Sequence, residues 1–333
     1  YVLGGLILIK EIYERKNQLF SSIKNKKYCL LQYWLQISII IAILVTLLLS
    51  SLAPPTDSDS LAYHLALPLA WLELGGFDPF YNWYVARLSG IGERIILFGL
   101  ANGTDVLSSL IQWSGLIISI VALSTFSQSI CFRDFILASL LVVSPPVILF
   151  LVLNQKPYLF PAASIVLAAS LYFNECKQTN IKLILIGFIL VSSVLFKYTF
   201  ILSTSGLVAV MLYDSLFVKK SKKLLYILII FSTLLVLPYL LRNYIYYGDP
   251  ISPLLSDYLS DTEPTLSYFK ESLKVGYSFN VINILKIPFT QGIITLSPGM
   301  ITTIIGFGGL AILMAVRSSN KKSKLLITSF FIS

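Results

Sequence analysis

Charged residues are scarce in this chain. Asp, Glu, Lys and Arg together make up 12% of its 333 residues, about half of the roughly 25% found in ordinary soluble domains. This shortage excludes a typical water-soluble globule, and the 56% share of hydrophobic residues indicates a membrane protein instead. A spanning helix needs about 20 apolar residues, so the chain has room for roughly ten spans. We predict one all-α, polytopic transmembrane domain over residues 1–333.

Metal-binding side chains are equally rare. The chain has one histidine, His64, and three cysteines that are far apart in the sequence, Cys29, Cys131 and Cys176. This set does not form a zinc-binding pattern. The net charge of +9 would suit a nucleic-acid-binding protein, but membrane topology explains how the charges are distributed along the chain. No nucleic-acid partner is therefore expected.

Apolar runs and polar segments alternate along the chain. We assign complete spans to eight runs: 31–53, 106–127, 135–152, 157–173, 183–200, 202–217, 224–241 and 292–316. Two shorter runs, 1–9 and 325 onward, are expected to be truncated spans of a fragment whose C-terminal part is missing.

The charges predict which loops face the cytoplasm. If residues 10–30 are cytoplasmic, the segments on that side carry 17 of the 25 Lys and Arg residues, and the other side carries 11 of the 16 Asp and Glu residues. This asymmetry satisfies the positive-inside rule. It also requires a break between the runs 183–200 and 202–217, because one continuous span would place the lysine-rich segment 218–223 outside.

Two predicted outer loops, 54–104 and 242–291, are about 50 residues long each. Helices need only short turns between them, so loops of this length usually carry function or structure of their own. We therefore expect the active site on the extracytoplasmic side.

The first outer loop is expected to contain two helices. A Pro-Pro pair at 54–55 cannot continue the preceding helix. Thr56 and Asp59 have the spacing of a capping box and predict a helix over 58–74. Apolar residues at helical spacing predict a second helix over 87–102. Both helices would lie at the membrane interface.

Asp57 and Asp59 allow two interpretations. As helix-capping residues they are stabilised by the helix dipole, typically by about 0.3–1 kcal/mol. As an Asp-x-Asp pair at a membrane surface, they would instead supply a general base or, together with Glu93, oxygen ligands for a divalent cation.

The neighbouring polar residues also have a structural and a functional interpretation. His64 and Tyr63 follow the aspartates by about one and a quarter turns, where an interfacial histidine with an ordinary hydrogen bond is the simpler role. Glu93 and Arg94 on the second helix would form a solvated surface pair, or contact substrate.

Two basic residues stand where positive charge is disfavoured. Lys197 lies 14 residues into the run 183–200, about 21 Å from its cytoplasmic end, so it either snorkels to the surface or has a functional partner. Arg242 lies where a span reaches the outer surface, and its planar guanidinium suits a phosphate. The tyrosines around Arg242 are typical of an interfacial aromatic belt.

At these residues the chain resembles the polytopic GT-C glycosyltransferases, which take sugars from polyprenyl-phosphate donors outside the cytoplasm. The likeness is in the order and shared sidedness of four short stretches: 54–65, 92–93 before 99–105, 197–199, and 242–244 with 248–250. The resemblance implies a base in the first outer loop, a glycan, lipid or protein acceptor, and a bacterial or archaeal plasma membrane. Here the acidic motif is Asp-x-Asp, whereas adjacent Asp and Glu are common among relatives.

The expected reaction is glycosyl transfer with inversion. Asp59 would remove a proton from the acceptor hydroxyl, Asp57 would orient it, and Lys197 and Arg242 would stabilise the leaving phosphate. The candidate substrate-binding residues are Lys197, Arg242, Glu93, His64 and Tyr63. No cofactor is expected, although a divalent cation at Asp57, Asp59 and Glu93 is an alternative.

Two other functions fit the same features. A flippase or transporter of lipid-linked saccharides would need charges along a path through the bilayer, often with repeated halves, whereas here the charges gather at one face. A polysaccharide polymerase also works outside on lipid-linked sugars, and the sequence does not separate it from a transferase.

Overall fold

The computed structural model describes residues 33–77, 83–126, 132–143, 146–174, 179–252 and Leu255. Every regular element within these ranges is a helix, and none is a strand. Helices satisfy all their backbone hydrogen bonds internally, as an apolar environment requires. The predicted all-α class is confirmed. The predicted runs at 1–9, 292–316 and 325 onward lie outside the described residues, as does nearly all of the second long loop.

Four helical stretches in the described part are long and apolar enough to cross a membrane. They are α3 (Trp34–Ser51), α7 (Leu107–Phe126), α12 (Phe200–Tyr213) with η2 (Asp214–Val218), and α13 (Lys223–Phe231) continued by η3 (Ser232–Val236) and α14 (Leu237–Tyr247). Large apolar side chains on their outer faces are exposed, for example Leu202 and Phe217. Such faces are suited to contact with lipid.

Two predicted spans are shorter helices than expected, and one is divided. The helices α10 (Leu159–Phe173) and α11 (Asn180–Phe196) are apolar but below 18 residues. In place of the run 135–152 there are two helices, α8 (Phe132–Val143) and α9 (Pro146–Leu153). Proline is favoured in the first turn of a helix and disfavoured in its interior, which explains why α9 begins at Pro146.

The predicted break near residue 200 is confirmed. Helix α11 ends at Phe196, and α12 begins at Phe200. Lys197 is extended, with φ −159° and ψ 132°. The placement of Lys197 within a span was therefore wrong, since this residue lies in the turn between two helices.

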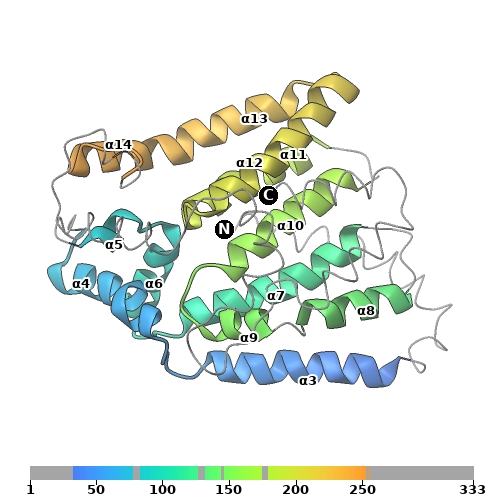
Figure 1. Ribbon diagram of the computed structural model, residues 1–333, viewed down its shortest axis with the longest axis horizontal. Helices are drawn as coiled ribbons and strands as arrows, with labels where there is room; N and C mark the ends of the chain where they lie inside the picture. Colours follow the sequence, from blue (N-terminus) through green and yellow to red (C-terminus); the bar gives the residue numbers. More distant parts are fainter. Residues whose placement is uncertain are drawn as a thin grey trace, which may run out of the picture.

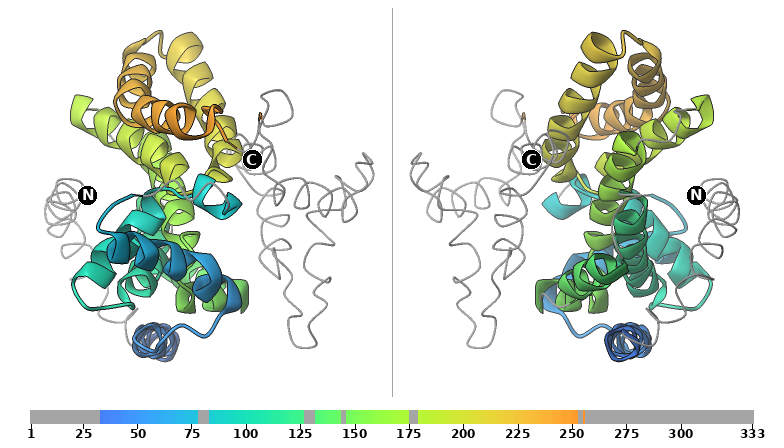
Figure 2. Two further views of the ribbon diagram at one scale, coloured as in Figure 1. Left: turned by 90° about the vertical axis from the view of Figure 1, so that its left-hand side faces the viewer. Right: turned by 90° about the vertical axis from the view of Figure 1, so that its right-hand side faces the viewer.

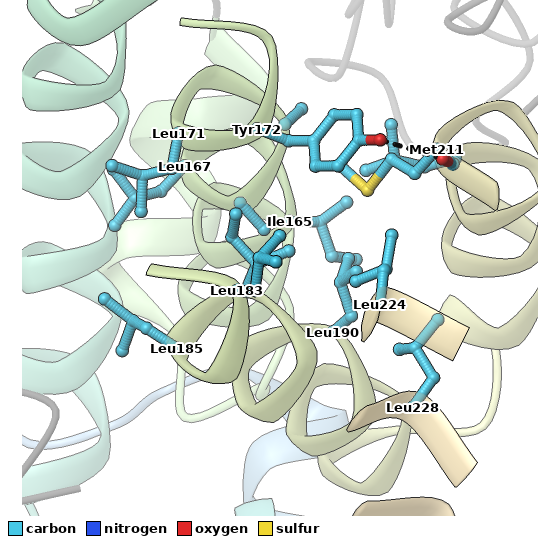
Figure 3. Packing of buried hydrophobic residues seen from close by; sticks show 14 of the residues in the cluster. Ile165, Leu167, Leu171, Tyr172, Leu183, Leu185, Leu190, Met211, Leu224 and Leu228 are labelled. Carbon is cyan, nitrogen blue, oxygen red and sulfur yellow. Dashed lines mark hydrogen bonds between the residues drawn. The ribbon is translucent and has the colours of Figure 1, made fainter. Parts of the chain in front are cut away.

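The largest apolar core joins α7, α10, α11, α12 and α13. Figure 3 shows Leu183 and Leu190 of α11 packed among side chains from the neighbouring helices. Helix α10 also approaches α7 closely at Gly115, where a Cβ atom would lie 2.7 Å from the Phe160 Cα atom. Small residues permit such close backbone contact between membrane helices.

The first outer loop contains its predicted helices at one end of the bundle. The helix predicted over 58–74 is confirmed: it begins at residue 58 and continues through η1 (Ser60–Leu65) and α4 (Ala66–Leu74). The second begins later than predicted, as α6 (Ile91–Ala101), after the short α5 (Tyr84–Arg87). Figure 1 shows α4, α5 and α6 together at the end of the bundle where α14 also lies.

Helix α14 extends beyond the predicted end of its span. It ends at Gly248, which has φ +69°, in the left-handed conformation that glycine adopts without strain. Arg242, the first residue of the predicted second loop, therefore lies inside a helix.

Figure 2, which views the bundle from its two ends, shows α3 end-on at its lower edge.

Candidate functional site

The polar end of the bundle is the end formed by segments 57–64, 87–94, 154–158, 197–199 and 239–249, which contact one another through polar side chains. Two acidic residues in it share one basic partner. The Lys156 Nζ atom lies 3.1 Å from Asp57 Oδ2 and 2.9 Å from Asp59 Oδ2. Asp57 is mostly buried, with 16% of its side chain exposed, whereas 57% of the Asp59 side chain is exposed. Asp59 is therefore the carboxylate that a solvent-borne group reaches more easily.

Asp57, rather than Thr56, caps the first loop helix. Its Oδ2 atom accepts hydrogen bonds from the Ser60 backbone N–H at 3.0 Å and from the Ser60 hydroxyl at 3.1 Å. The capping interpretation of Asp57 is confirmed, but the predicted Thr56 and Asp59 capping box was wrong by one residue. The cap leaves Asp59 free to bind Lys156 from the first turn of the helix.

The turn that carries Lys156 is anchored through its neighbour Gln155. The Gln155 backbone N–H donates to Ser60 Oγ at 3.2 Å, and its side-chain amide donates to Ser109 Oγ at 2.7 Å. The Gln155 carbonyl oxygen accepts from the Ser108 hydroxyl at 3.1 Å. These bonds join the first loop helix, α7 and the turn after α9, so the Lys156 backbone is held in place against both aspartates.

The charges of this cluster support each other. Burial alone would raise the pKa of Asp57, but the Ser60 hydrogen bond and the Lys156 ammonium lower it below the usual value. Burial would lower the pKa of Lys156, but hydrogen bonds and charge from Asp59 and Asp57 raise it. Both groups are therefore charged at neutral pH.

A second pair, His64 and Glu93, joins the two loop helices. The His64 Nδ1 and Glu93 Oε1 atoms are 2.9 Å apart, and the His64 residue is 1% exposed. The other carboxylate oxygen, Oε2, accepts from the Gly90 backbone N–H at 2.7 Å at the start of α6. His64 Nε2 is buried and has no hydrogen-bond partner in the described part of the chain.

The structure shows that Glu93 is not a surface residue. Burial would raise its pKa, but the hydrogen bond and charge of His64, together with the Gly90 N–H, lower it. The predicted solvated pair of Glu93 with Arg94 was therefore wrong. Glu93 also does not join Asp57 and Asp59: no group of three or more His, Cys, Asp or Glu side chains among the described residues is arranged to hold a metal ion. Tyr63, half-buried, contacts the His64 ring in a tilted arrangement, with centroids 4.0 Å apart.

Glycines bring the second loop helix against the break after α11. A Cβ atom on Gly90 would lie 2.3 Å from the Leu195 carbonyl oxygen, and one on Gly92 would lie 2.5 Å from Pro157 Cβ. Only glycine permits such approach without a shift of the backbone. This contact places Glu93 and Lys197, which is next to Phe196, at the same end of the bundle.

Lys197 is half-buried against an aromatic partner. Its ammonium donates to the Tyr158 hydroxyl and lies 3.7 Å from the centre of that ring. Tyr158 is two residues after Lys156, and its backbone N–H donates to the Lys156 carbonyl oxygen at 2.8 Å. Lys197 is therefore connected to the aspartate cluster through the 154–158 turn rather than by direct contact.

Tyrosines connect α14 to the break after α11 and to the first loop. The Tyr239 hydroxyl donates to the Ser89 carbonyl oxygen, and the Tyr239 and Tyr198 rings meet edge to face at 5.3 Å. The Asn243 side-chain amide donates to the Tyr198 hydroxyl at 2.8 Å. These buried contacts hold α14 in register, a more specific role than the predicted aromatic belt.

Arg242 and Arg94 act on each other electrostatically at this end of the bundle. The Arg242 guanidinium lies 5.7 Å from the Tyr239 ring centre. Burial, then the charge of Arg242, lowers the pKa of Arg94. Among the described residues neither arginine has a carboxylate within salt-bridge distance. The charges of Tyr239 and Glu93 act in the opposite direction on Arg94. Two positive charges that repel each other, with no carboxylate in salt-bridge contact, form a site suited to an anion.

Several residues of the site were missed by sequence reasoning. Lys156 is the one charged residue between Asp134 and Glu175, and no motif distinguishes it. Arg94 had been paired with Glu93, and Tyr158 and Tyr239 had no signal apart from being aromatic. A conspicuous acidic motif on the same predicted side as one isolated lysine is the signal that could have identified Lys156.

Comparisons with known proteins give a family and no activity. Curated proteins and solved structures yield no match to this chain. A protein-family model, described as the DUF1420 N-terminal domain, matches residues 5–333. The match covers nearly the whole sequence, and the chain therefore belongs to the DUF1420 family.

Proposed function

We propose that this protein is a membrane glycosyltransferase of the GT-C kind, which transfers a sugar from a polyprenyl-phosphate donor to an acceptor outside the cytoplasm. The observation that carries the proposal is the position of the Asp59 carboxylate. This carboxylate is exposed and is held by Lys156 at the same end of the bundle as Lys197, Arg94 and Arg242. Eight complete spans, with this end facing outward from a bacterial or archaeal plasma membrane, belong to the same proposal.

In the proposed reaction the Asp59 carboxylate takes the proton of an acceptor hydroxyl. The acceptor oxygen forms a bond to the anomeric carbon as the bond from that carbon to the phosphate oxygen breaks. The electron pair of the broken bond goes to the polyprenyl phosphate, and the sugar inverts its configuration. An exposed carboxylate suits this role because an acceptor hydroxyl can come within hydrogen-bonding distance of it.

Basic side chains supply the complementary charge. Among the described residues Arg94 and Arg242 form no salt bridge and repel each other, so an incoming phosphate would be attracted to both. Lys197, bound to Tyr158, lies between this arginine pair and the aspartates along the contacts described above. Preorganised charge of this kind is typically the largest contribution to catalysis.

The buried pair has a positioning role in this scheme. His64 and Glu93 are too buried to touch a lipid-linked donor directly, so we assign them to fixing the first loop helix relative to α6. This placement replaces the earlier prediction that they bind substrate. Tyr63 is half-buried beside His64 and remains a candidate contact for the acceptor.

The decisive experiment measures cleavage of the donor. Purified full-length protein in detergent is incubated with a panel of labelled polyprenyl-phosphate sugars, and release of polyprenyl phosphate is followed. We expect Asp59→Asn to lower the rate by about 100-fold or more, and Glu73→Gln, on the exposed face of α4, to leave it unchanged. Undiminished turnover by Asp59→Asn would refute the role of Asp59. Movement of intact donor across vesicles without cleavage would instead identify a flippase.

A further inference from the structure

We infer that the Lys156 ammonium occupies the place that a divalent cation would need between Asp57 and Asp59, so that this carboxylate pair functions without a metal ion. The inference concerns how the acidic centre is neutralised. It rests on the proposed function only for its activity measurement, because the binding measurements below need no turnover.

The first argument is the geometry of the cluster. Lys156 Nζ lies 3.1 Å from Asp57 Oδ2, 3.4 Å from Asp57 Oδ1 and 2.9 Å from Asp59 Oδ2. The two shorter distances are those of hydrogen bonds between charged groups. Magnesium binds oxygen at about 2.0–2.1 Å and calcium at about 2.3–2.6 Å, so a cation among the same oxygens would lie beside a fixed positive charge and be repelled.

The second argument is that Lys156 is held in this position. Gln155, immediately before it, makes three hydrogen bonds to Ser60, Ser108 and Ser109. Only 12% of the Lys156 side chain is exposed, and its ammonium lies 5.4 Å from the centre of the Phe150 ring. A lysine on a mobile surface loop could move aside for a cation, whereas this one is fixed by its backbone and its packing.

The third argument is the charge and the number of ligands. Two carboxylates and one ammonium leave one net negative charge, which the exposed side of Asp59 presents to a neutral hydroxyl. Within the described ranges no third carboxylate joins the pair, and Glu93 is bound instead to His64 and to the Gly90 N–H. The two carboxylates therefore have an internal counterion, and no further carboxylate helps a divalent cation to displace it.

The inference is tested with Mn²⁺, whose binding to the purified full-length protein is followed by electron paramagnetic resonance. The wild-type protein is expected to bind no Mn²⁺ that depends on Asp59. Lys156→Met, which keeps an apolar stem over Phe150, should gain a Mn²⁺ site at least about tenfold tighter than any in the wild type, because the repelling charge is gone. Lys156→Arg keeps the charge and should gain none.

A double variant assigns the new site. Lys156→Met combined with Asp59→Asn should lose the Mn²⁺ site that Lys156→Met alone gains. Mn²⁺ should also raise the melting temperature of Lys156→Met and leave that of the wild type unchanged, since a ligand of the folded state stabilises it. Absence of a new site in folded Lys156→Met would overturn the inference.

The wild-type protein alone provides an independent measurement if Lys156→Met does not fold. Wild-type Mn²⁺ binding that disappears in Asp59→Asn would show that a metal and not Lys156 neutralises the pair, and would overturn the inference. In the activity assay, EDTA should change the wild-type rate by less than about twofold. Loss of the rate in EDTA, with recovery on adding Mg²⁺, would contradict the inference while leaving the proposed transferase function intact.

Discussion

The polar end and the apolar core hold the same helices together by different means. In the core, α10 and α11 contact their neighbours through buried aliphatic side chains such as Leu190 and Ile186. At the polar end, the contacts are single pairs between distant segments, such as Lys156 with Asp57 and Glu93 with His64. Apolar packing tolerates changes that conserve volume, whereas a polar pair is satisfied by few geometries.

This difference explains where function can reside. Helices packed by aliphatic side chains in lipid gain little specificity from each contact. Polar pairs fix the loops to within the tolerance that catalysis requires. The two regions should therefore respond differently to mutation. A change at the polar end should remove a polar pair and so displace the loop that the pair holds. A change in the core should lower stability while leaving the site intact.

The largest expected effect is at the buried pair of the polar end. Glu93→Ala would leave His64 Nδ1 and the Gly90 N–H buried without their partner, and since each buried polar group left unsatisfied typically costs about 1–3 kcal/mol, we expect a loss of about 3–5 kcal/mol. The free energy of unfolding, measured by denaturant titration in detergent micelles, should fall by this amount. Glu73→Ala, an exposed site on α4, is the matched control and should have almost no effect. A small loss in Glu93→Ala would show that the pair does not fix the loop.

The next effect is steric. Gly90→Ala would bring its Cβ atom 2.3 Å from the Leu195 carbonyl oxygen, and a backbone atom cannot turn away as a side chain can. We expect a cost of about 3 kcal/mol, at the upper end of the range for overpacking. Gly76→Ala is the control, because nothing lies within 4 Å of its Cβ position. Equal melting temperatures for the two variants would show that the loop does not approach α11 this closely.

A core substitution tests the other half of the comparison. Leu190→Ala removes a fully buried side chain from α11, and the resulting cavity should lower the free energy of unfolding by about 2 kcal/mol. Leu202→Ala, whose side chain is 72% exposed on α12, should have far less effect. The donor-cleavage rate per folded molecule should stay at the wild-type value in Leu190→Ala. A large loss of that rate would mean that the core and the polar end are coupled.

The helices were predictable from the sequence because each membrane helix is a long run of apolar residues. A run of apolar residues must be helical in lipid, so the stretches near α3, α7, α10 and the 58–74 helix were placed within a few residues. The break at Lys197 followed from charge sidedness, which is a property of the whole chain. The errors were at helix ends, where one cap or one glycine decides the boundary: α14 continues to Gly248.

The partners in the site were much less predictable. Asp57, Asp59, Lys197 and Arg242 had been placed on one side of the membrane, but no sequence spacing relates Lys156 to residues almost one hundred positions earlier. Glu93 is predicted to lie away from the apolar face of its helix, either in a surface pair with Arg94 or in the site itself. Whether a carboxylate is exposed or bound to a buried histidine depends on how two helices cross, and this is decided by packing between distant segments.

The smallest expected effect is the pH dependence of the capping aspartate. Because its pKa is lowered in the folded protein, Asp57 contributes stability above its unfolded pKa of about 3.9, and this contribution disappears as the pH falls through the folded value. Asp57→Asn keeps a good helix cap but loses the attraction to Lys156. We therefore expect it to be less stable than the wild type by about 1 kcal/mol at pH 7.

Comparison of the two proteins at low pH isolates this charge. The lowered pKa of Glu93 makes both proteins less stable in acid, but Glu93 is present in both and cancels in the difference between them. The stability gap between wild type and Asp57→Asn should therefore close as the pH falls from 7 through the lowered pKa of Asp57 in the folded protein, where the wild-type carboxylate takes up its proton. A gap that is constant with pH would show that Asp57 acts through its shape as a cap, and that the pairing with Lys156 adds nothing to the stability of the polar end.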